Sequence, residues 1–504
     1  MATASQLENH PTPAGNQMLQ LDRPELIVRH AWISNKRVSS NDGGTFAVEN
    51  PADGSLLAEV ADCGAAEARA AADAAHQAFT RWRKLLAKDR AAHLQAWLAK
   101  VKKNEEDLAR LISLEQGKPL PESRAEVAYG AAYIEWFAEE AKRTYGDVIP
   151  ETAPGRKIIV VKEPVGVAAA ISPWNFPNAM LARKIAPALA AGCTVVAKPA
   201  EDTPLSALAL ASLAAEAGIP EGVINVVPAA RKNAGSVAGA WLEDERVRKL
   251  SFTGSTAVGK HLAEASASTL KRLSLELGGN APFIVFDDAD LDQAVKGMIA
   301  AKFRNAGQTC ICANRIYVAD AIYEEFAERA VQAVAKLRVG PAGTDAEIGP
   351  LINARALEKV ERHVSNAIEL GARVLVGGKR HSLGRYFYEP TVLANVDSRM
   401  ILSCEETFGP VAPLFRFHSE DEAIAAANGT PFGLAAYFYS PDVARVMRVS
   451  AALESGMVGI NEAAISTEVA PFGGVKDSGY GREGSPYGID EYLQTKYLCL
   501  GGLT

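Results

Sequence analysis

A cysteine, a glutamate and an asparagine lie in three segments that could together carry out nucleophilic catalysis. Cys310 lies in NAGQTCICANR, residues 305–315, between a predicted helix that ends near Arg304 and a predicted strand that starts near Arg315. A thiol in a loop at a strand edge can meet a substrate, and nearby dipoles can tune its pKa. A lone loop cysteine is more often inert than catalytic, so this interpretation depends on the other two segments.

The glutamate and the asparagine each lie where a predicted strand ends. In LSLELGGN, residues 273–280, strand alternation separates the leucines from Ser274 and Glu276, and two glycines allow close approach. A carboxylate there suits a general base, and a solvated strand end is the simpler alternative. In SPWNFPN, residues 172–178, the Asn175 amide could donate to a developing oxyanion, or could form only an Asx turn between two prolines.

A parallel sheet is predicted to position these segments. From Val161 onward, short β-branched runs such as VGVAAAI and CTVVAKP alternate with helical segments such as MLARKIAPALAAG. This repetition is typical of right-handed βαβ units and a doubly wound sheet, which binds ligands beyond the carboxyl ends of its strands. A second α/β unit begins near Ala281 with PFIVFDD, and an Ala-rich helical pattern covers about Gly64 to Gln116. The predicted fold class is therefore α/β.

Length and composition narrow the classes of protein that remain. A chain of 504 residues exceeds one ordinary core, so two or more domains are expected. Hydrophobic residues at 48% and charged residues at 22% are typical of a globular protein that folds without a metal, and no metal site is predicted. A net charge of −7 without a long Lys/Arg block argues against nucleic acid or an anionic membrane as a partner.

The cysteine content and the N-terminal sequence indicate the cellular compartment in which the protein is expected. Six cysteines in this length are too sparse for a disulfide scaffold and fit a reducing compartment. The N-terminal MATASQLENHPTPAGNQ has neither a basic region nor an apolar run, and no apolar stretch reaches the length of a bilayer span. A cytoplasmic protein is expected.

Seven motifs, in this order, resemble those of the aldehyde dehydrogenase superfamily: PWNFP, KPAEDTP, FTGSTAVG, LELGG, FRNAGQTC, EETFGP and PFGG. The likeness runs from about Arg23 to the end of the chain. It implies that Cys310 attacks an aldehyde carbon as a thiolate, giving a thiohemiacetal and then a thioester. Asn175 and the Cys310 backbone N–H would hold the oxyanion, and Glu276 would activate the water that hydrolyses the thioester.

The resemblance also implies NAD as the cofactor, with NADP as a less preferred alternative. The chain lacks a G-x-G-x-x-G fingerprint, and the family instead uses FTGSTAVG, where Gly254 and Ser255 would meet the pyrophosphate at a helix N-terminus. Glu201 would accept hydrogen bonds from the adenine ribose and repel a 2′-phosphate. The other positions implied to bind the cofactor are Trp174, Lys198, Glu406 and Phe408.

Within the superfamily the chain most resembles the NAD(P)-dependent succinate semialdehyde dehydrogenases. Arg183, Arg304 and Ser466 match positions that grip the substrate carboxylate there, and an arginine fork suits a carboxylate because it donates two parallel hydrogen bonds. Each arginine could instead cap a helix or pair with an acid. Glutarate semialdehyde is one methylene longer, and a pocket discriminates one methylene by only about 1–3 kcal/mol. A glutarate semialdehyde dehydrogenase and a broader short-chain aldehyde dehydrogenase therefore remain alternatives.

Cys312, two residues after the proposed nucleophile, motivates a redox hypothesis. Two residues of extended chain span roughly 7 Å, the upper limit of the Cα separation in a disulfide. A bent loop would allow a Cys310–Cys312 bridge that switches the enzyme off under oxidation, as some relatives are reported to do. A small buried thiol is an equal alternative.

The family resemblance implies two doubly wound Rossmann-like domains and a small β-ribbon that carries oligomer contacts, in a homodimer or homotetramer. An acylating or phosphorylating relative generally lacks the water-activating glutamate, so Glu276 favours hydrolysis; a purely structural family member is disfavoured by the three catalytic candidates together. The expected boundaries are a flexible N-terminal arm at 1–20, an NAD-binding domain at 21–143 and 162–279, an oligomerisation ribbon at 144–161 and 485–504, and a catalytic domain at 280–484.

Overall fold

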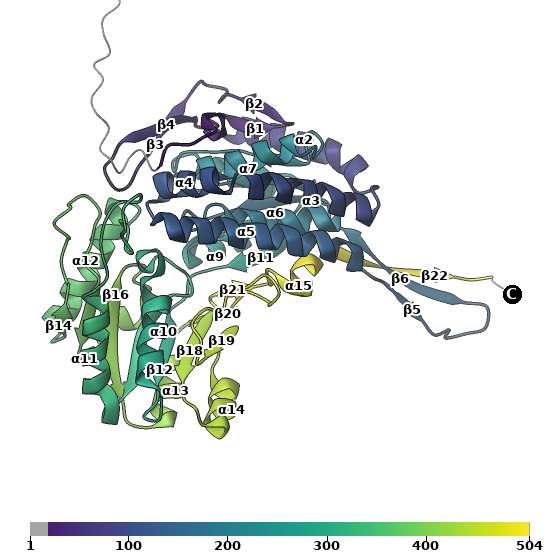
Figure 1. The fold of residues 1–504 in the computed structure, drawn as a ribbon. Helices are drawn as coiled ribbons and strands as arrows, with labels where there is room; N and C mark the ends of the chain where they lie inside the picture. The colour runs from purple at the N-terminus through teal and green to yellow at the C-terminus, as the bar shows by residue number, and fades with distance from the viewer. Residues whose placement is uncertain (1–18, 503–504) are drawn as a thin grey trace, which may run out of the picture.

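Two large sheets, each covered by helices on both faces, dominate the computed structural model, which describes residues 19–502 (Figure 1). Their parallel cores confirm the predicted α/β class with two Rossmann-like units. The predicted flexible arm at 1–20 lies outside the described residues except for Leu19 and Gln20, and Leu19 is buried. Among the helices of residues 19–502, none combines the length and the apolar character that crossing a bilayer requires.

The first sheet has the strand order β2-β1-β9-β8-β7-β10-β11-β21. The five strands from β9 to β11 run parallel, and burial on both faces explains their near-continuous apolar sequences. The strands are β1 Ala31–Ile33, β2 Lys36–Val38, β7 Val167–Ile171, β8 Thr194–Lys198, β9 Ile224–Val226, β10 Val247–Thr253, β11 Arg272–Glu276 and β21 Gly479–Tyr480.

Helices cover this sheet on its two faces. One face carries α2, α8 and α9, and the other carries α3 to α7, with separate apolar cores beneath them. In α2, apolar residues three and four apart form the buried stripe, which is the pattern of an amphipathic helix. The helices are α2 Ala65–Trp82, α3 Ala87–Lys103, α4 Glu105–Gln116, α5 Leu120–Glu140, α6 Ala179–Ala191, α7 Leu205–Glu216, α8 Ala234–Glu243, α9 Thr256–Ser266 and α15 Ser485–Asp490.

The second sheet has the order β14-β15-β16-β13-β12-β18-β19, with α10 and α11 on one face and α12, α13 and α14 on the other. Its strands are β12 Ala281–Val285, β13 Ala313–Ala319, β14 Arg373–Val376, β15 Thr391–Ala394, β16 Val411–Phe417, β18 Ala435–Tyr439 and β19 Met457–Ile460. Its helices are α10 Leu291–Phe303, α11 Tyr323–Val334, α12 Ala354–Glu369, α13 Glu420–Asn428 and α14 Val443–Ala452.

Antiparallel strands at the sheet edges were not part of the prediction. The hairpin of β1 and β2 turns at Ser34 and Asn35, both in the left-handed region, as a two-residue turn between antiparallel strands requires. Strand β14 likewise runs antiparallel to β15, and β21 to β11. Outside the two sheets lie the pairs β3 Thr45–Glu49 with β4 Leu56–Ala61, and β17 Phe432–Gly433 with β20 Val475–Lys476.

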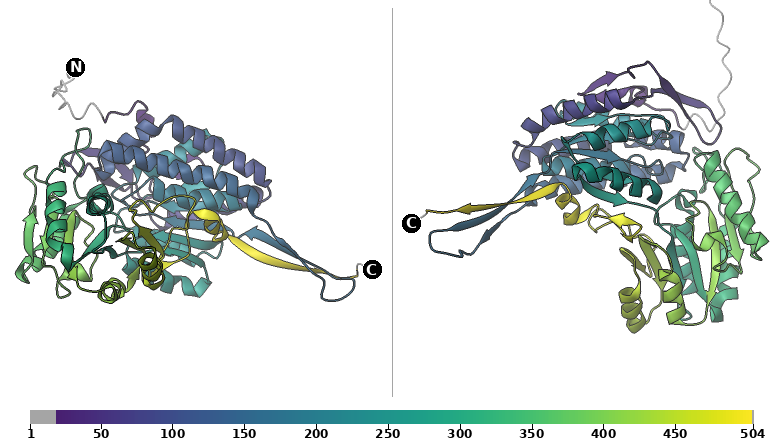
Figure 2. Two further views of the ribbon diagram at one scale, coloured as in Figure 1. Left: turned by 60° about the horizontal axis from the view of Figure 1, so that its bottom comes forward. Right: turned by 180° about the vertical axis from the view of Figure 1, so that it is seen from behind.

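A three-stranded ribbon projects from the first unit (Figure 2). It consists of β5 Asp147–Ile149, β6 Lys157–Pro164 and β22 Leu493–Leu500, so its strands run three residues beyond the expected boundary at 161. Val148, Tyr497 and Leu500 are exposed apolar side chains on it. Short 3-10 helices occur at Pro24–Leu26, Ala141–Arg143, Ala267–Thr269, Arg304–Gly307, Asp320–Ile322 and Ile401–Ser403.

The chain passes between the two sheets twice. The first passage joins β11 to β12, and the second leads from the β17–β20 pair to β21, which hydrogen-bonds to β11 of the first sheet. Residues 479–484 were expected in the catalytic domain, whereas the first two of them form β21 of the first sheet. The two passages are bonded to each other, because the Leu277 N–H donates to the Ser478 carbonyl at 3.0 Å and Ser478 Oγ donates to the Gly278 carbonyl at 2.8 Å.

Candidate active site

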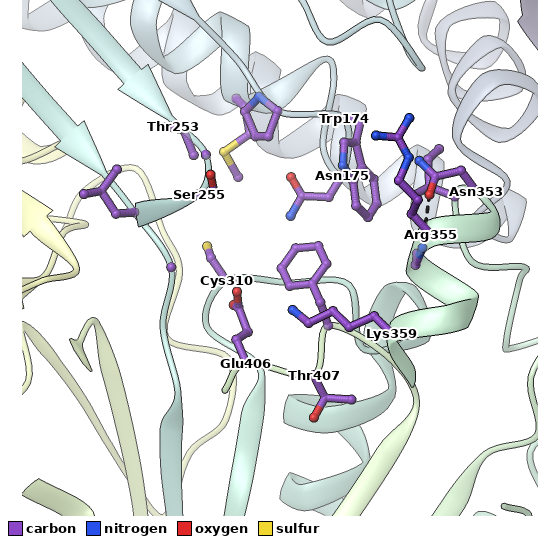
Figure 3. Close-up of a pocket in the computed structure, with 18 of the residues that line it drawn as sticks. Trp174, Asn175, Thr253, Ser255, Cys310, Asn353, Arg355, Lys359, Glu406 and Thr407 are labelled. Atoms are coloured by element: carbon purple, nitrogen blue, oxygen red, sulfur yellow. Dashed lines mark hydrogen bonds between the residues drawn. The ribbon is translucent and has the colours of Figure 1, made fainter. Parts of the chain in front are cut away.

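A cavity of about 360 Å³ lies between the two units, with Cys310 in its wall (Figure 3). The first unit contributes residues that follow the carboxyl ends of β7, β10 and β11, and the second contributes the Cys310 loop, the start of α12 and the segment at 406–408. This is the edge of a parallel sheet at which ligands are expected to bind. Cys310 and Asn175 line this cavity, whereas Glu276 does not line it and directly precedes the lining residues Leu277 and Gly278.

Cys310 lies in the loop between α10 and β13, as predicted. The preceding 3-10 segment holds Asn305 at a φ of 52° and Ala306 at a φ of 54°, both in the left-handed region. Such a conformation costs of order 1 kcal/mol or more for a residue with a Cβ, and it persists only where the surroundings impose it. Burial raises the pKa of the Cys310 thiol to about 12, and the Arg183 guanidinium acts in the opposite direction. The thiol is therefore neutral near pH 7 in this state.

Asn175 follows β7, and its side chain projects into the same cavity as Cys310 (Figure 3). Only 3% of the residue is exposed. Its Nδ2 donates to the Gln308 carbonyl at 3.0 Å, whereas its Oδ1 is buried without a partner among the described residues. An Asx turn does not account for this side chain, because its partner lies in the nucleophile loop.

Glu276 is the last residue of β11, as predicted, but it is not a solvated strand end. Only 2% of it is exposed, and neither carboxylate oxygen has a hydrogen-bond partner among the described residues. Burial and the nearby Glu483 carboxylate raise its pKa well above the usual value, against the opposing charges of Arg183 and Lys184. A buried carboxyl without partners is strongly basic once it loses its proton, which suits proton abstraction.

The residues expected at the pyrophosphate and the nicotinamide line the cavity. They are Trp174, Gly254, Ser255, Glu406 and Phe408. Ser255 lines the cavity and is the N-cap of α9, so the backbone N–H groups of the first turn of this helix lie at the cavity wall.

The carboxylate and aromatic groups at this end of the cavity also fit a dinucleotide. Glu406 Oε1 is buried without a partner among the described residues, as expected of a carboxylate that accepts from ribose hydroxyls. The Phe408 backbone is left-handed at a φ of 56°, and its ring packs edge-on against Trp174 with 5.4 Å between centroids.

Lys198 and Glu201 do not line this cavity. Lys198 is buried, and its Nζ donates to the Pro199 carbonyl at 3.0 Å and lies 4.0 Å from the Glu201 carboxylate. Glu201 lines a second cavity of about 210 Å³, which shares Arg231, Ile352 and Asn353 with the first. The two cavities adjoin at these three residues, and the cofactor contacts expected of Lys198 and Glu201 stay predictions.

Arg304 and Ser466 line a third cavity of about 160 Å³, together with Tyr129 and Phe176. The Tyr129 and Ser466 hydroxyls hydrogen-bond to each other, and the Arg304 guanidinium lies 4.9 Å from the centre of the Phe176 ring. Arg304 is exposed and forms no ion pair with any residue of the described chain. The acidic residues Glu122 and Glu126 nevertheless line the same small pocket.

Arg183 does not lie with Arg304 and Ser466. It is fully buried, pairs with Glu483, and lies over the Phe472 ring at 4.3 Å. The alternative foreseen for it, an arginine paired with a nearby acid, is what the structure contains. Its charge favours the thiolate of Cys310 and the carboxylate of Glu276. A grip on the substrate stays a prediction for this residue.

Comparisons with known proteins agree on one family. The model of the aldehyde dehydrogenase family matches residues 38–498. The chain is 58% identical to 3-sulfolactaldehyde dehydrogenase of Pseudomonas putida, 56% identical to the NADP(+) succinate-semialdehyde dehydrogenase of Escherichia coli, and 55% identical to glutarate-semialdehyde dehydrogenase of Pseudomonas aeruginosa. Each match covers 96% of this chain and 100% of the relative. The chain belongs to the aldehyde dehydrogenase family.

The solved structures support the same assignment. The crystal structure of succinate-semialdehyde dehydrogenase from Burkholderia pseudomallei matches with a TM-score of 0.94 and 55% identity, over 95% of this chain and 99% of that one. This aldehyde dehydrogenase is therefore an NAD(P)-dependent oxidoreductase that acts on a small molecule. The predicted family, fold and cofactor class are confirmed.

The second cysteine of the Cys310 loop is sequestered in this aldehyde dehydrogenase. Cys312 is fully buried, and its thiol donates to the Lys302 carbonyl at 3.4 Å. Burial raises its pKa. The loop is bent, since the Cys312 N–H donates to the Thr309 carbonyl at 3.1 Å, and both thiols are free. The disulfide switch stays a prediction.

His363 of α12 contacts the segment at 405–407 behind the cavity wall. Its ring lies 3.2 Å from Thr407 Oγ1 and 3.3 Å from Glu405 Oε2, and the Thr407 side chain points away from the cavity (Figure 3). Burial and the nearby charges of Lys359 and Arg362 lower the His363 pKa to about 4, although Glu405 acts in the other direction.

Protonation of His363 is expected to destabilise the folded enzyme between pH 6.5 and about 4. Because the His363 pKa is lower in the folded state, the unfolded chain binds the proton more tightly. The free energy of unfolding therefore decreases as the pH falls through this window. The loss should reach on the order of 3 kcal/mol at its acidic end. Denaturant unfolding of the wild type and of His363→Gln at both ends of the window checks this. Equal losses in both proteins would contradict it.

Several buried charged residues near the site were not found from the sequence. Lys118, just before α5, and Glu126 of α5 are buried, Glu122 midway between them is half-buried, and Lys184 pairs with Glu483 at 2.5 Å. The spacing of the first three places them on one helix face, which was the only available signal. On a long amphipathic helix such a stripe normally indicates a solvent-exposed face, so the sequence does not indicate that these charged side chains are buried.

Proposed function

We propose that the enzyme oxidises succinate semialdehyde to succinate with NAD, through a covalent thiohemiacetal and thioester on Cys310. The observation that carries the substrate class is the exposed Arg304, which has no acidic partner in the described chain and lies beside Ser466 in a small pocket. A guanidinium placed there can take the carboxylate of a short aldehyde acid through two charge-assisted hydrogen bonds.

The Cys310 thiol releases its proton to water as its sulfur bonds to the aldehyde carbon, and the carbonyl π electrons move to the aldehyde oxygen, which takes up the negative charge. The Asn175 amide exchanges its hydrogen bond to the Gln308 carbonyl for one to this oxyanion, and the Cys310 N–H donates a second. One such donor contributes roughly 10²–10³-fold to the rate. When bound, the nicotinamide supplies the hydride acceptor for the carbon attached to sulfur, which leaves the thioester.

Hydrolysis of the thioester is assigned to Glu276. Its carboxylate takes a proton from a water molecule that attacks the acyl carbon. The carbon–sulfur bond then breaks and the carboxylic acid leaves, and the proton held by Glu276 passes to the departing sulfur, which restores the Cys310 thiol. General base catalysis of this kind contributes about 10²–10⁴-fold. Neither oxygen of the Glu276 carboxylate is bonded within the described chain, so both can accept from a water molecule once the buried side chain turns toward the cavity, which Glu276 does not line in this structure.

The preference for NAD is assigned to Glu201, which lines the second cavity. Its carboxylate lies beside Asp202, whose own pKa is raised to about 6 by burial and by Glu201. Two neighbouring carboxylates disfavour a 2′-phosphate. Arg231 in the same cavity wall offers a partial counter-charge, so NADP is a weaker cofactor rather than an excluded one.

The related substrates are all anionic aldehydes, judged by the names of the relatives. Glutarate semialdehyde is one methylene longer and 3-sulfolactaldehyde replaces the carboxylate with a sulfonate, and both present an anion to Arg304. Succinate semialdehyde is the first candidate, because the pocket at Arg304 and Ser466 is small and a carboxylate is less bulky than a sulfonate. Glutarate semialdehyde is the second candidate, and a broad short-chain aldehyde dehydrogenase the third.

The test is a kinetic panel on the purified enzyme. NAD(P)H absorbance is followed with succinate semialdehyde, glutarate semialdehyde, 3-sulfolactaldehyde and butanal, each with NAD and with NADP. The proposal expects the highest kcat/KM for succinate semialdehyde with NAD. Equal kcat/KM for butanal would remove the anion-binding role, and a higher value for another anionic aldehyde would reassign the substrate.

Arg304→Met is expected to lower kcat/KM for succinate semialdehyde by about 10–100-fold, mainly through KM, because a charge-assisted hydrogen bond contributes about 1.5–3 kcal/mol. Butanal oxidation should change less than twofold. Arg124→Met is the matched control, since this exposed arginine of α5 pairs with Glu106 away from the pocket. An equal effect on both aldehydes would contradict the anchoring role.

The assembly and compartment belong to the same proposal. We assign the oligomer contact to the projecting ribbon, whose exposed apolar side chains favour burial against a second copy in a homodimer or homotetramer. A cytoplasmic location is supported by the six cysteines, all of which are free.

A further inference from the structure

We propose that Lys118 is a positioning residue that holds Asn175, the oxyanion donor, against the nucleophile loop. This inference rests on the proposed role of Asn175. Lys118 lies just before α5 and lines none of the three cavities described above, so it does not touch substrate or cofactor there. It acts through the backbone of the loop that follows β7.

The Lys118 ammonium is completely buried, and its neighbours are the Asn175–Phe176 segment and the Glu126 carboxylate. Its Nζ donates to the Asn175 carbonyl at 2.7 Å and to Glu126 Oε2 at 2.5 Å, and it lies 3.8 Å from the centre of the Phe176 ring. Burying a charged pair brings little net stability, whereas it can specify a unique local conformation. Here the specified conformation is that of the Asn175–Phe176 backbone.

Glu126 extends the same restraint to the start of α6. Its Oε1 accepts from the Asn178 N–H at 2.9 Å and from the Ala179 N–H at 3.3 Å. The α5 helix approaches this segment closely, because a Cβ at Gly130 would lie 2.5 Å from Asn178 Oδ1. The loop that carries the oxyanion donor is thus fixed at Asn175 by Lys118 and at its end by Glu126.

The nucleophile loop is tied to the same carbonyl. Asn305 Nδ2 donates to the Asn175 carbonyl at 3.1 Å, so this oxygen accepts from Lys118 and from the nucleophile loop together. The Asn305 N–H in turn donates to both oxygens of Glu122, at 2.9 and 3.1 Å. The left-handed backbone at Asn305 and Ala306 is therefore held from α5 as well.

This arrangement fixes the distance between the amide of Asn175 and the sulfur of Cys310. Loss of the Lys118 contact leaves the Asn175 carbonyl with one donor and frees the loop to shift. A displacement of about 1 Å can cost a catalytic group roughly 10²-fold in rate. The effect should appear in kcat, because the oxyanion exists only after the aldehyde is bound.

A double-mutant cycle tests the inference. In the wild type, Asn175→Ala should lower kcat by about 100-fold or more. Lys118→Met should lower kcat by about 10–100-fold, with the KM for aldehyde and the Kd for NAD changed less than threefold. In the Lys118→Met background, Asn175→Ala should then lower kcat by less than about fivefold, because a misplaced donor already contributes little to the rate. Lys102→Met, on an exposed lysine that pairs with Glu135 of α5, is the control and should leave all constants unchanged.

Each other outcome is decisive. If Asn175→Ala costs its full factor in both backgrounds, the two residues act independently and the Lys118 inference is overturned while the oxyanion role stands. If Asn175→Ala costs little in the wild type, the oxyanion role itself fails. Should Lys118→Met not fold, the cycle is run on Lys118→Met with Glu126→Gln, which leaves no unpaired charge. Wild-type kcat in that pair would show that Lys118 only neutralises Glu126, and would overturn the inference.

Discussion

Cys310→Ala is expected to abolish aldehyde oxidation and leave dinucleotide binding intact. The substitution removes the only thiol in the wall of the main cavity, among the residues that the structure describes, and retains the backbone N–H that donates to the oxyanion. Without the covalent step the enzyme keeps only binding and electrostatic assistance. The loss of kcat should therefore be about 10⁴-fold or more.

The measurement pairs NADH formation with NAD binding, the latter followed by quenching of the fluorescence of Trp174 in the cavity wall. Cys404→Ala is the control, because Cys404 is an exposed free cysteine outside the cavity. Residual activity above a few per cent in the purified Cys310→Ala enzyme would mean that the covalent intermediate forms elsewhere. Lost NAD binding would mean that the thiol supports the site structurally.

Glu276→Gln is expected to give one rapid equivalent of NADH and then to stall. Glutamine has nearly the shape of the protonated carboxyl, the form favoured by the raised pKa of Glu276, so the strand and cavity should be preserved. It cannot take a proton from water, so the thioester should accumulate while steady turnover falls by about 10²–10⁴-fold.

Rapid mixing followed by NADH absorbance separates the burst from the steady rate, and mass spectrometry of the quenched enzyme identifies an acyl group on Cys310. Glu243→Gln, at an exposed position at the end of α8, provides the control. A variant that loses the burst together with the steady rate would place Glu276 before hydride transfer, as the base that deprotonates the thiol. The assignment of hydrolysis to Glu276 would then be wrong.

The sequence allowed prediction of the elements around the site because their signals are local. Buried parallel strands such as β8 are continuous apolar runs, and the segments containing Asn175, Glu276 and Cys310 follow or end strands whose carboxyl ends must share one edge. The N-terminal hairpin β1–β2 could not be predicted in this way. Its strands are three residues long, and its Ser34–Asn35 turn lacks the glycine that usually marks such hairpins.

The parts of the site that could not be predicted depend on contacts between distant segments. Arg183 is paired with Glu483, 300 residues further along the chain, and no local pattern indicates that partner. The left-handed Ala306 contradicts the intrinsic preference of alanine and is imposed by its surroundings. Lys118 acts on a carbonyl 57 residues away. Such relations follow from packing, which the order of the motifs does not specify.

The two chain passages between the sheets constrain how the molecule can move. They are the only covalent connections between the units within the described residues, and they are hydrogen-bonded side by side through Leu277, Gly278 and Ser478. If the hydrogen bonds that Asn305 makes to Asn175 and Glu122 across the units are broken, a rotation of one unit against the other is expected to turn about an axis close to this pair. Points near an axis travel least, and Glu276 directly precedes the first passage. Such a rotation would move the outer end of the cavity furthest and Glu276, the proposed proton acceptor, least.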